Sequence, residues 1–370
     1  MDFVFKVVPY DRAAFLSDAL PSIPKTSAVY RIFDTHGQLI VLDKTSNLFQ
    51  RLERFFGPHL EKVKDLDLSA ITSRIEFVRT ASPFETAYVL YLERRRAFPK
   101  TYRKMRTFRF FTLMKINRRQ RFPRIYASRE IKTGVDYFGP FLSRAQFGRV
   151  KTTLERTFRL RPCPYNIRGN DPHPDCLYFQ IHSCSRPCNN DIDRAGYFAD
   201  VQAARAFVQG HDAALADPLI SRIGSLALET RFEEAEVLRR QLEKLRHARQ
   251  EVKDTFVSVW DFDYLVVLPA ETSSHRKIAF VRAASIIGFE EYEVTSLVDA
   301  LQKDLERFYG SPLRESRRDW QYDEFCLVSS FLVDPLQSAD LIPFSPSADF
   351  AATIQKRIED RKHMKKETQA

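Results

Sequence analysis

The sequence lacks any long apolar segment. Its 370 residues contain no stretch of about 18 consecutive apolar residues, so we expect no membrane-spanning helix. The N-terminus MDFVFKVVPYDRAAF carries acidic residues too early for a signal peptide, and internal repeats and low-complexity tracts are missing. We therefore expect a soluble cytoplasmic protein. A hydrophobic content of 44% is enough for the cores of roughly two to four domains.

Acidic residues are missing from one long segment. The chain has 58 Lys and Arg against 48 Asp and Glu, a net charge of +10 and a pI of about 9.3. Between positions 94 and 129 there are fourteen Lys and Arg and no Asp or Glu. Such a run has no local ion-pair partners, so it attracts phosphate and releases counterions on binding. The alternative is a solvated surface whose charges pair with acidic residues elsewhere.

We interpret this basic segment as a candidate nucleic-acid interface. Aromatic residues, among them Tyr102 and Phe108, lie between the charges. The residues that we expect to contact DNA are Arg94, Arg95, Arg96, Arg103, Lys104, Arg106, Arg109, Arg118 and Arg119.

Short extended segments and helices alternate at the start of the chain. AVYRIF (28–33) and LIVLD (39–43) flank the turn DTHGQ and predict a β-hairpin. Possible caps at 45–47 and apolar residues at helical spacing predict a helix next, and Pro83 predicts another through Arg96. Further strands are expected at 75–80, 108–116 and 124–131. The pattern predicts an α/β module with a mixed or antiparallel sheet.

The remainder divides into a turn-rich stretch, helices and a second α/β region. Residues 137–190 are rich in turns and cysteine, and a helix is expected at about 191–215. Asp217-Pro218 predicts the start of the next helix. Strands return at 255–345, including the apolar EFCLVSSFLV, with a helix around Leu297–Tyr309 and a charged helix or frayed tail at the end.

A narrow apolar seam predicts a pair of antiparallel helices. Apolar residues recur at helical spacing before and after a break at Thr230-Arg231. Two short helices bury their apolar stripe incompletely, so we expect the stripe to bind a partner protein. The alternative is that the stripe packs against the rest of its own chain. The residues expected to bind a partner are Phe232, Ala235, Leu238, Arg239 and Leu242.

Four of the five cysteines lie within 26 residues, with the spacing C-x12-C-x7-C-x3-C. They are Cys163, Cys176, Cys184 and Cys188. Intracellular chains rarely keep disulfides, so these thiols predict a soft-metal site, either an iron–sulfur cluster or zinc, with free buried thiols as the alternative. The absence of a C-x2-C pair disfavours a zinc ribbon, although His173 or His182 could replace a cysteine. Cys326 is expected to be a core residue of an apolar strand.

Several segments resemble the N-terminal half of the bacterial excinuclease subunit UvrC and its shorter relative Cho. They are AVYRIF, KTSNLFQRLERFF, YFGPF, RLRPC with CLYFQIHSCSRPC, and FEEAEVLRRQLEKL. The resemblance implies an iron–sulfur cluster at the cysteines and a UvrB-binding helical hairpin in the last segment. It covers residues 20–250 well and continues weakly to the end. The RNase H-like nuclease and helix–hairpin–helix module that follow in UvrC are not expected in this chain.

The first module of that family is a GIY-YIG nuclease, which makes the 3′ incision beside a DNA lesion. The resemblance implies that Tyr30, Lys44 and Arg51 are retained catalytic residues. Other positions differ from the family pattern: Ala28 and Asp43 replace glycines, and Val41 and Phe55 replace tyrosines.

The metal-binding glutamate of the family aligns with Leu90, which cannot hold a divalent cation. Glu93 lies one helical turn further on, so a shifted register or a migrated ligand is the alternative. Asp43 or Glu85 could also be recruited. We expect an inactive nuclease, with Mg²⁺ or Mn²⁺ bound only if the site is active.

Three functions follow from these patterns. The first is a non-catalytic nucleotide excision repair factor that binds DNA and UvrB. The second is an active Cho-type endonuclease, and the third is a stand-alone nucleic-acid-binding protein. No membrane partner is expected.

The expected domain layout has five parts. They are a GIY-YIG-like domain at 1–105, a basic extension and four-cysteine region at 106–190, helices with a UvrB-binding-like (UVR) hairpin at 191–250, a C-terminal α/β domain at 251–350 and a charged tail at 351–370.

Overall fold

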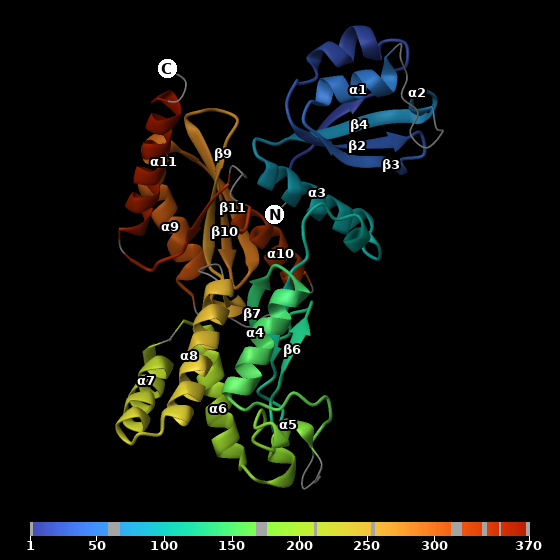
Figure 1. Ribbon diagram of the computed structural model, residues 1–370. Helices are drawn as coiled ribbons and strands as arrows, with labels where there is room; N and C mark the ends of the chain where they lie inside the picture. Colours follow the sequence, from blue (N-terminus) through green and yellow to red (C-terminus); the bar gives the residue numbers. More distant parts are fainter. Residues whose placement is uncertain are drawn as a thin grey trace.

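The computed structural model describes residues 3–57, 67–167, 176–210, 213–252, 256–311, 320–334, 339–347 and 349–367. Within these residues the chain forms three four-stranded sheets, and every strand pairing is antiparallel. The first sheet, within residues 6–79, lies at one end of the molecule (Figure 1). The third sheet, within residues 264–343, lies beside it, and the second, within residues 112–258, lies below them (Figure 1). The α/β class predicted from the sequence is confirmed. Across the described ranges, no helix combines the length and apolar character needed to cross a membrane.

The first sheet has the strand order β1-β4-β2-β3. Its strands are β1 (Lys6–Pro9), β2 (Ala28–Asp34), β3 (Leu39–Thr45) and β4 (Thr72–Arg79). The predicted hairpin is confirmed as β2 and β3. Helices α1 (Leu48–Phe56) and α2 (Leu68–Ile71), with the turns η1 (Phe15–Ala19) and η2 (Leu20–Ser22), cover one face.

Helix α1 begins at a capping residue that the sequence suggested. The side chain of Asn47 accepts a hydrogen bond from the backbone N–H of Gln50 at 3.1 Å, which satisfies a donor of the first turn. Leu48, Leu52 and Phe55 then bury one stripe of the helix against the sheet. The cap and the stripe together place α1 over the face on which Tyr30 lies.

Helix α3 (Pro83–Ala97) packs between the first sheet and the third. Ser82 caps it and Pro83 occupies its first turn, as predicted. One side of α3 packs under the first sheet through Val89 and Leu90. Its other side, which includes Phe84 and Tyr88, contributes to the core of the third sheet. A helix buried on two sides fixes the relative position of the two parts that it joins.

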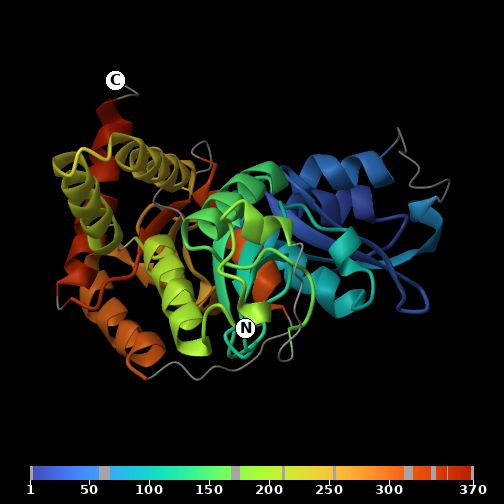
Figure 2. The ribbon, with the colours of Figure 1, turned by 60° about the horizontal axis from the view of Figure 1, so that its bottom comes forward.

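The second sheet has the order β6-β5-β7-β8. Its strands are β5 (Thr112–Ile116), β6 (Ile125–Ser128), β7 (Asp136–Phe141) and β8 (Val257–Ser258). Helices α4 (Arg144–Thr157), α6 (Arg194–Val208) and α8 (Phe232–Val252) share one core with this sheet. The shorter elements η3 (Tyr102–Lys104), α5 (Leu177–Gln180) and η4 (Pro187–Asn189), together with α7 (Ala213–Leu228), complete this region. Figures 1 and 2 both place α7 and α8 at the end of the molecule opposite the first sheet.

The third sheet has the order β11-β10-β9-β12. Its strands are β9 (Tyr264–Pro269), β10 (His275–Arg282), β11 (Ser285–Glu293) and β12 (Asp340–Pro343), with the turns η5 (Val259–Asp261) and η6 (Val294–Ser296). Helices α9 (Leu297–Tyr309) and α11 (Phe350–Glu367) cover one face, while α10 (Gln321–Leu332) and α3 cover the other. The bounds of α9 and the helical end of the chain confirm the predictions.

Two predicted elements were wrong. EFCLVSSFLV, predicted as a strand, forms most of α10 instead. Because almost every residue of α10 is buried, its apolar residues surround the helix and leave no helical period to read. The helix predicted to start at Asp217-Pro218 begins at Ala213, since the preceding Ala and Leu residues favour helix.

Helix α4 was missed within the stretch interpreted as turn-rich. Its signals are present in the sequence: the Ser143 side chain accepts from the backbone N–H of Gln146 at 3.0 Å, as a cap residue does. Phe147, Val150 and Leu154 recur at helical spacing and are buried in the core of the second sheet.

Candidate functional site

Tyr30 and Lys44, two residues expected at a phosphate site, lie on neighbouring strands. In the β2–β3 register Tyr30 lies opposite Asp43, and Lys44 lies opposite Val29. Adjacent residues of a strand point to opposite faces, so Tyr30 and Lys44 leave the sheet on opposite sides. The Tyr30 ring is buried, 6.3 Å from the Phe55 ring between centroids. The two side chains therefore do not converge on one phosphate.

Arg51, the third retained residue, lies on α1. Its guanidinium sits 5.7 Å from the centroid of the Phe55 ring. Arg51 is half-buried and Lys44 is exposed, so both remain open to an anion. Each charge by itself could contact a phosphate, whereas cleaving a phosphodiester also needs a metal ligand.

Leu90, the residue that the resemblance aligns with a metal ligand, is a core residue. It is 1% exposed and packs with Val29, Leu42 and Val89. Val29 lies on the face of the sheet opposite to Tyr30, so α3 covers the face away from that tyrosine. A carboxylate at position 90 would therefore point into an apolar core rather than toward Tyr30.

Each carboxylate considered as a substitute ligand is held by a basic side chain. The pairs are Asp43 with Arg94 at 3.2 Å, Glu85 with Lys277 at 2.6 Å and Glu93 with Arg31 at 2.5 Å. A metal ion would have to displace these cations before it could bind. In the described ranges, no group of three or more His, Cys, Asp or Glu side chains is arranged to hold a metal ion.

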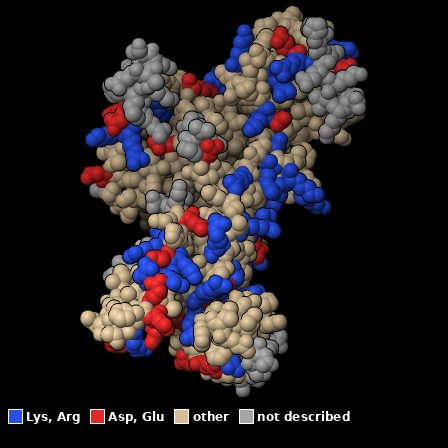
Figure 3. Space-filling view, viewed as in Figure 1, with Lys and Arg blue, Asp and Glu red and all other residues tan. Residues whose placement is uncertain are grey.

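The basic segment runs from the end of α3 across α10 to the second sheet. Figure 3 shows its side chains as a blue band that continues from the end of α3 toward β6 and α4. Arg94 and Arg95 are half-buried, and the other expected DNA contacts are exposed. These are Arg96, Arg103, Lys104, Arg106, Arg109, Arg118 and Arg119.

Acidic residues on both sides of the segment and elsewhere in the chain neutralise part of this band. The ion pairs are Arg94–Asp43, Arg96–Glu93, Arg103–Asp323, Lys115–Glu130 and Arg118–Asp136. By contrast, Lys104, Arg106 and Arg109 pair with no carboxylate among the residues that the structure describes. Part of the basic segment is therefore paired with acidic residues, and part of it is free to attract phosphate. An excess of positive charge remains exposed.

The middle of the basic segment is anchored on α10. The Tyr102 hydroxyl donates to the Asp323 carboxylate at 2.8 Å, and the Arg103 guanidinium donates to the same oxygen at 3.2 Å. Asp323 is fully buried, and the neighbouring Tyr322 hydroxyl donates to the carbonyl of Phe111 at 2.5 Å. These bonds hold the segment in a fixed course, so its exposed charges keep their spacing.

All four clustered cysteines line one cavity of about 420 Å³. Cys163 and Cys176 are half-buried, and Cys184 and Cys188 are buried. Burial raises the pKa of Cys184 to about 11 and also raises that of Cys188. The spacing pattern therefore corresponds to a true spatial cluster that lies on both sides of α5.

The surroundings of the cysteines suit bound thiolates. The buried guanidinium of Arg161 lies 3.6 Å from the Cys163 sulfur, and the Arg186 backbone N–H donates to the Cys184 sulfur at 3.4 Å. Positive charge and N–H donors around sulfur are typical of metal-bound cysteines. All four cysteines therefore border the same cavity as these donors.

The remaining candidate ligands lie elsewhere. His182 lines a different groove, between α4 and α8, and is exposed. His173 lies outside the described residues. Cys326 is fully buried, which confirms the core position, although it lies on a helix rather than a strand.

Helices α7 and α8 form the predicted hairpin, with the break at Thr230-Arg231. Ala235 and Leu242 are buried and Leu238 is half-buried, whereas Arg239 is exposed. Phe232 is 65% exposed at the start of α8. The C-terminal half of α8, by contrast, packs into the core of the second sheet through residues such as Leu245 and Val252. One end of the hairpin is thus part of the protein's own core, and the other end is open.

Comparison with known proteins supports this reading of the sequence. Residues 111–207 match the UvrC/Cho excinuclease middle domain. The chain is 28% identical over 294 residues to the UvrABC system protein C of Rhodospirillum rubrum, covering 79% of this chain and 46% of that protein. The chain is UvrC-like. The resemblance to the N-terminal half of UvrC is thereby confirmed.

Other UvrC proteins give the same result. Identity is 28% over 284 residues with the UvrABC system protein C of Histophilus somni (strain 2336), covering 74% of this chain and 45% of that protein. It is 27% over 297 residues with that of Rickettsia africae, covering 80% and 46%. The UvrC-like chain spans about half the length of these relatives. No solved structure matches it.

The matched middle domain runs from β5 to α6 and contains the four clustered cysteines and α4. Basic residues of α4, among them Arg149 and Arg156, were missed in the sequence because the helix itself was missed. The Ser143 cap and the helical spacing would have placed them on one helix.

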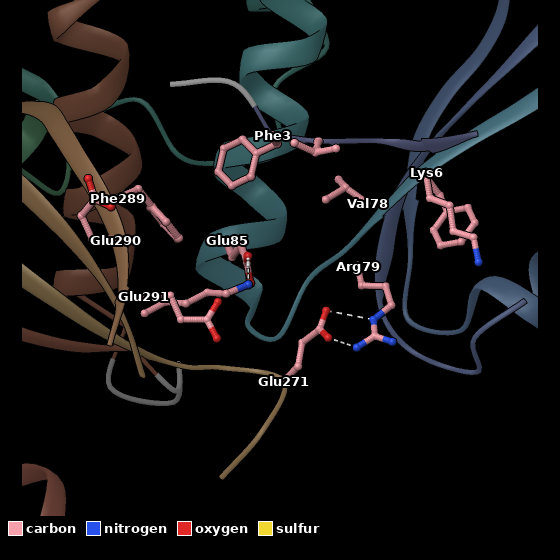
Figure 4. Close-up of a pocket in the computed structure, with 12 residues that line it drawn as sticks. Phe3, Lys6, Val78, Arg79, Glu85, Glu271, Phe289, Glu290 and Glu291 are labelled. Carbon is pink, nitrogen blue, oxygen red and sulfur yellow. Dashed lines mark hydrogen bonds and ion pairs between the residues drawn. The ribbon is translucent and has the colours of Figure 1, made fainter. Parts of the chain in front are cut away.

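A pocket of about 390 Å³ lies between the first and third sheets of the UvrC-like chain. In Figure 4 Glu85 comes from α3, and the Arg79 and Glu271 side chains point toward each other and are joined by dashed lines. Arg79 pairs with Glu271, and Glu85 pairs with Lys277. These lining charges pair across the boundary between the two parts and help to hold them together.

Proposed function

We propose that the chain is a nucleotide excision repair factor that binds DNA and UvrB without cutting DNA. The observation that carries this proposal is the buried Leu90 in place of a metal ligand, on the sheet face away from Tyr30. The three carboxylates that could substitute are ion-paired. Without a divalent cation, phosphodiester cleavage loses the Lewis acid that stabilises its developing charge.

The basic segment supports DNA binding. Its exposed Lys104, Arg106 and Arg109 have no carboxylate partner among the described residues, and α10 anchors the chain beside them. Contacts of this kind go to phosphates and carry little sequence information. We expect affinity that falls steeply with salt and differs little between sequences.

The open end of the α7–α8 hairpin supports binding of UvrB. Leu228 is 88% exposed and Phe232 is 65% exposed, on either side of the break between the helices. Large apolar side chains grouped at a helical tip are typical of a docking surface. Replacing Phe232 with Ala should weaken UvrB capture, whereas the Val7→Ala control removes an exposed apolar group at the far end of the molecule.

The cysteine cavity supports an iron–sulfur cluster rather than zinc. One zinc ion needs four sulfurs at about 2.3 Å from a single point, whereas a cluster spreads its ligands over several iron atoms. A cavity of about 420 Å³ lined by four cysteines has room for a group larger than one ion. Cys163, Cys176, Cys184 and Cys188 would hold the cluster, which would tie together the segments on both sides of α5.

A second candidate function, an active Cho-type endonuclease, is favoured by the retention of Tyr30, Lys44 and Arg51. An incision assay separates the two. The purified chain is incubated with UvrA, UvrB and a lesion-bearing duplex, first in magnesium and then in manganese, beside the Arg51→Ala variant. We expect binding to the UvrB–DNA complex and no nick. A 3′ nick that disappears in Arg51→Ala would establish the endonuclease, and DNA binding without UvrB binding would leave a stand-alone nucleic-acid-binding protein.

A further inference from the structure

A groove of about 1090 Å³ runs between α4 and α8, and its described lining shares no residue with the basic segment or the cysteine cavity. Helix α4 contributes Thr152 and Arg156, and α8 contributes Lys244 and His247. The turn after α5 closes one end with His182. Neither the nuclease residues nor the open tip of the hairpin lies in this groove.

Basic side chains dominate the groove. The described residues that line it include five Lys and Arg and two His against a single carboxylate, that of Glu251. Glu251 pairs with Arg149 at 2.9 Å, so it neutralises only one of these charges. In Figure 3 blue side chains gather between α4 and α8, while red ones follow the lower part of α8.

The charges in the middle of the groove are the least neutralised. Arg240 pairs with Glu236 at 2.8 Å, and Arg159 lies near Asp200. Arg156 and Lys244 are exposed, and neither pairs with a carboxylate in the described part of the chain. These two residues lie on facing helices, so an anion in the groove would meet both of them.

We propose that this groove binds the phosphate backbone of duplex DNA. Threonine hydroxyls beside basic side chains are common donors to phosphate oxygens, and Thr152, Thr153 and Thr157 line the groove. Gly148 has open space where a side chain would stand, which lets a backbone approach α4 closely. The described lining residues include no Phe, Tyr or Trp, so the groove lacks the large aromatic platforms on which the bases of a single strand stack.

The groove continues the basic segment. The Arg109 side chain, near the end of that segment, donates to the carbonyl of Leu142. Leu142 directly precedes Ser143, the cap of α4. A duplex on the basic segment would therefore pass along α4 and α8 toward the open hairpin tip. The proposal rests on the DNA binding proposed above and extends it to the middle domain and α8.

The test compares two matched double variants of the full chain. Arg156→Gln with Lys244→Gln removes two charges from the groove. Arg246→Gln with Lys303→Gln removes two exposed charges outside it, from α8 and α9. Binding of a fluorescein-labelled undamaged duplex, and of the same single strand, is followed by fluorescence anisotropy from about 50 to 200 mM salt. Thermal unfolding of each variant checks that the fold is kept, and UvrB capture is measured in parallel.

Each phosphate contact contributes about 0.9 to the slope of log affinity against log salt, so the groove variant should lose about 1.8. Its duplex affinity should fall about tenfold or more near 0.1 M salt, with the control unchanged. An unchanged slope in the groove variant, while the wild type binds duplex, would overturn this proposal and leave the proposed function standing. Lost UvrB capture with unchanged DNA binding would overturn it in favour of a protein interface. Failure of the wild type to bind any DNA would overturn both proposals.

Discussion

Glu85 on α3 and Lys277 on β10 form an ion pair at 2.6 Å between residues 192 positions apart. Their side chains are only 2% and 13% exposed, so the pair is shielded from water. The Phe3 and Phe289 rings pack against each other beside this pair, and their centroids are 5.6 Å apart. Through these contacts the first sheet is docked on the third, which fixes where Lys44 and Arg51 lie relative to the basic segment.

Removing one partner of this pair should loosen the docking. Lys277→Met leaves the buried Glu85 carboxylate without its cation, which costs about 3 to 5 kcal/mol in comparable sites. We expect a lower denaturation midpoint by circular dichroism. Adding Glu85→Gln should recover much of the loss, because the double variant buries no unpaired charge.

The neighbouring pair is a matched control for this prediction. Arg79 and Glu271 join the same two parts, but their side chains are 42% and 41% exposed. Arg79→Met should therefore cost about 1 kcal/mol or less. Equal losses in Lys277→Met and Arg79→Met would mean that burial of the first pair contributes nothing.

Restoring a carboxylate at position 90 should not restore a nuclease. Leu90→Glu places an unpaired charge in the core between α3 and the first sheet, at a cost of several kcal/mol. Leu90→Met, which keeps the volume, should cost less than about 1.5 kcal/mol. Neither variant should nick a lesion-bearing duplex with UvrB in magnesium. A nick made by Leu90→Glu would show that Tyr30 and position 90 can meet at one metal ion.

Stability should depend on pH through Glu155 of α4. Burial raises the pKa of this carboxyl above its ordinary value of 4.5, although Lys151 lies 2.6 Å away and opposes the shift. The folded chain therefore holds the proton more tightly than the unfolded chain. Its contribution to stability is present below the ordinary pKa and is lost as pH rises through the folded value.

The Glu155→Gln variant checks this dependence. It cannot ionise, so its free energy of unfolding should rise relative to the wild type as pH increases from about 4 to 7. Urea titrations at several pH values measure the difference. Glu229→Gln, at an exposed carboxylate, is the control for the change in net charge. A constant difference between Glu155→Gln and the wild type across this range would contradict the prediction.

Loss of one clustered cysteine should abolish metal binding. Cys184→Ala removes a buried sulfur from the cavity, so the chain purified without oxygen should lose its iron and sulfide. Cys326→Ala should retain both, because Cys326 is buried in α10 outside the cavity. Elemental analysis of both variants is the measurement. Zinc in the wild type, or iron that survives in Cys184→Ala, would contradict the assignment.

Elements with local signals were predicted well. The β2–β3 hairpin, the Asn47 cap of α1 and the Ser82-Pro83 start of α3 depend on residues close together in the sequence. Helix α10 was mistaken for a strand because its burial on all sides hides the helical period. Helix α4 has a cap and a helical period of its own. Because this helix was not predicted, the groove residues Arg156 and Thr152 were not predicted as a site.

By itself, the sequence determined which groups are available. They are four clustered cysteines, an acid-free basic segment, a helical hairpin and a leucine at the position where the resemblance predicts a metal ligand. Only the tertiary structure decided which of these groups meet. It brought the cysteines to one cavity, paired Arg94 with Asp43 and Arg103 with Asp323, and placed Leu90 and Tyr30 on opposite faces of a sheet. The physical reason is that burial and charge neutralisation depend on neighbours that are distant along the chain. No local pattern records those neighbours.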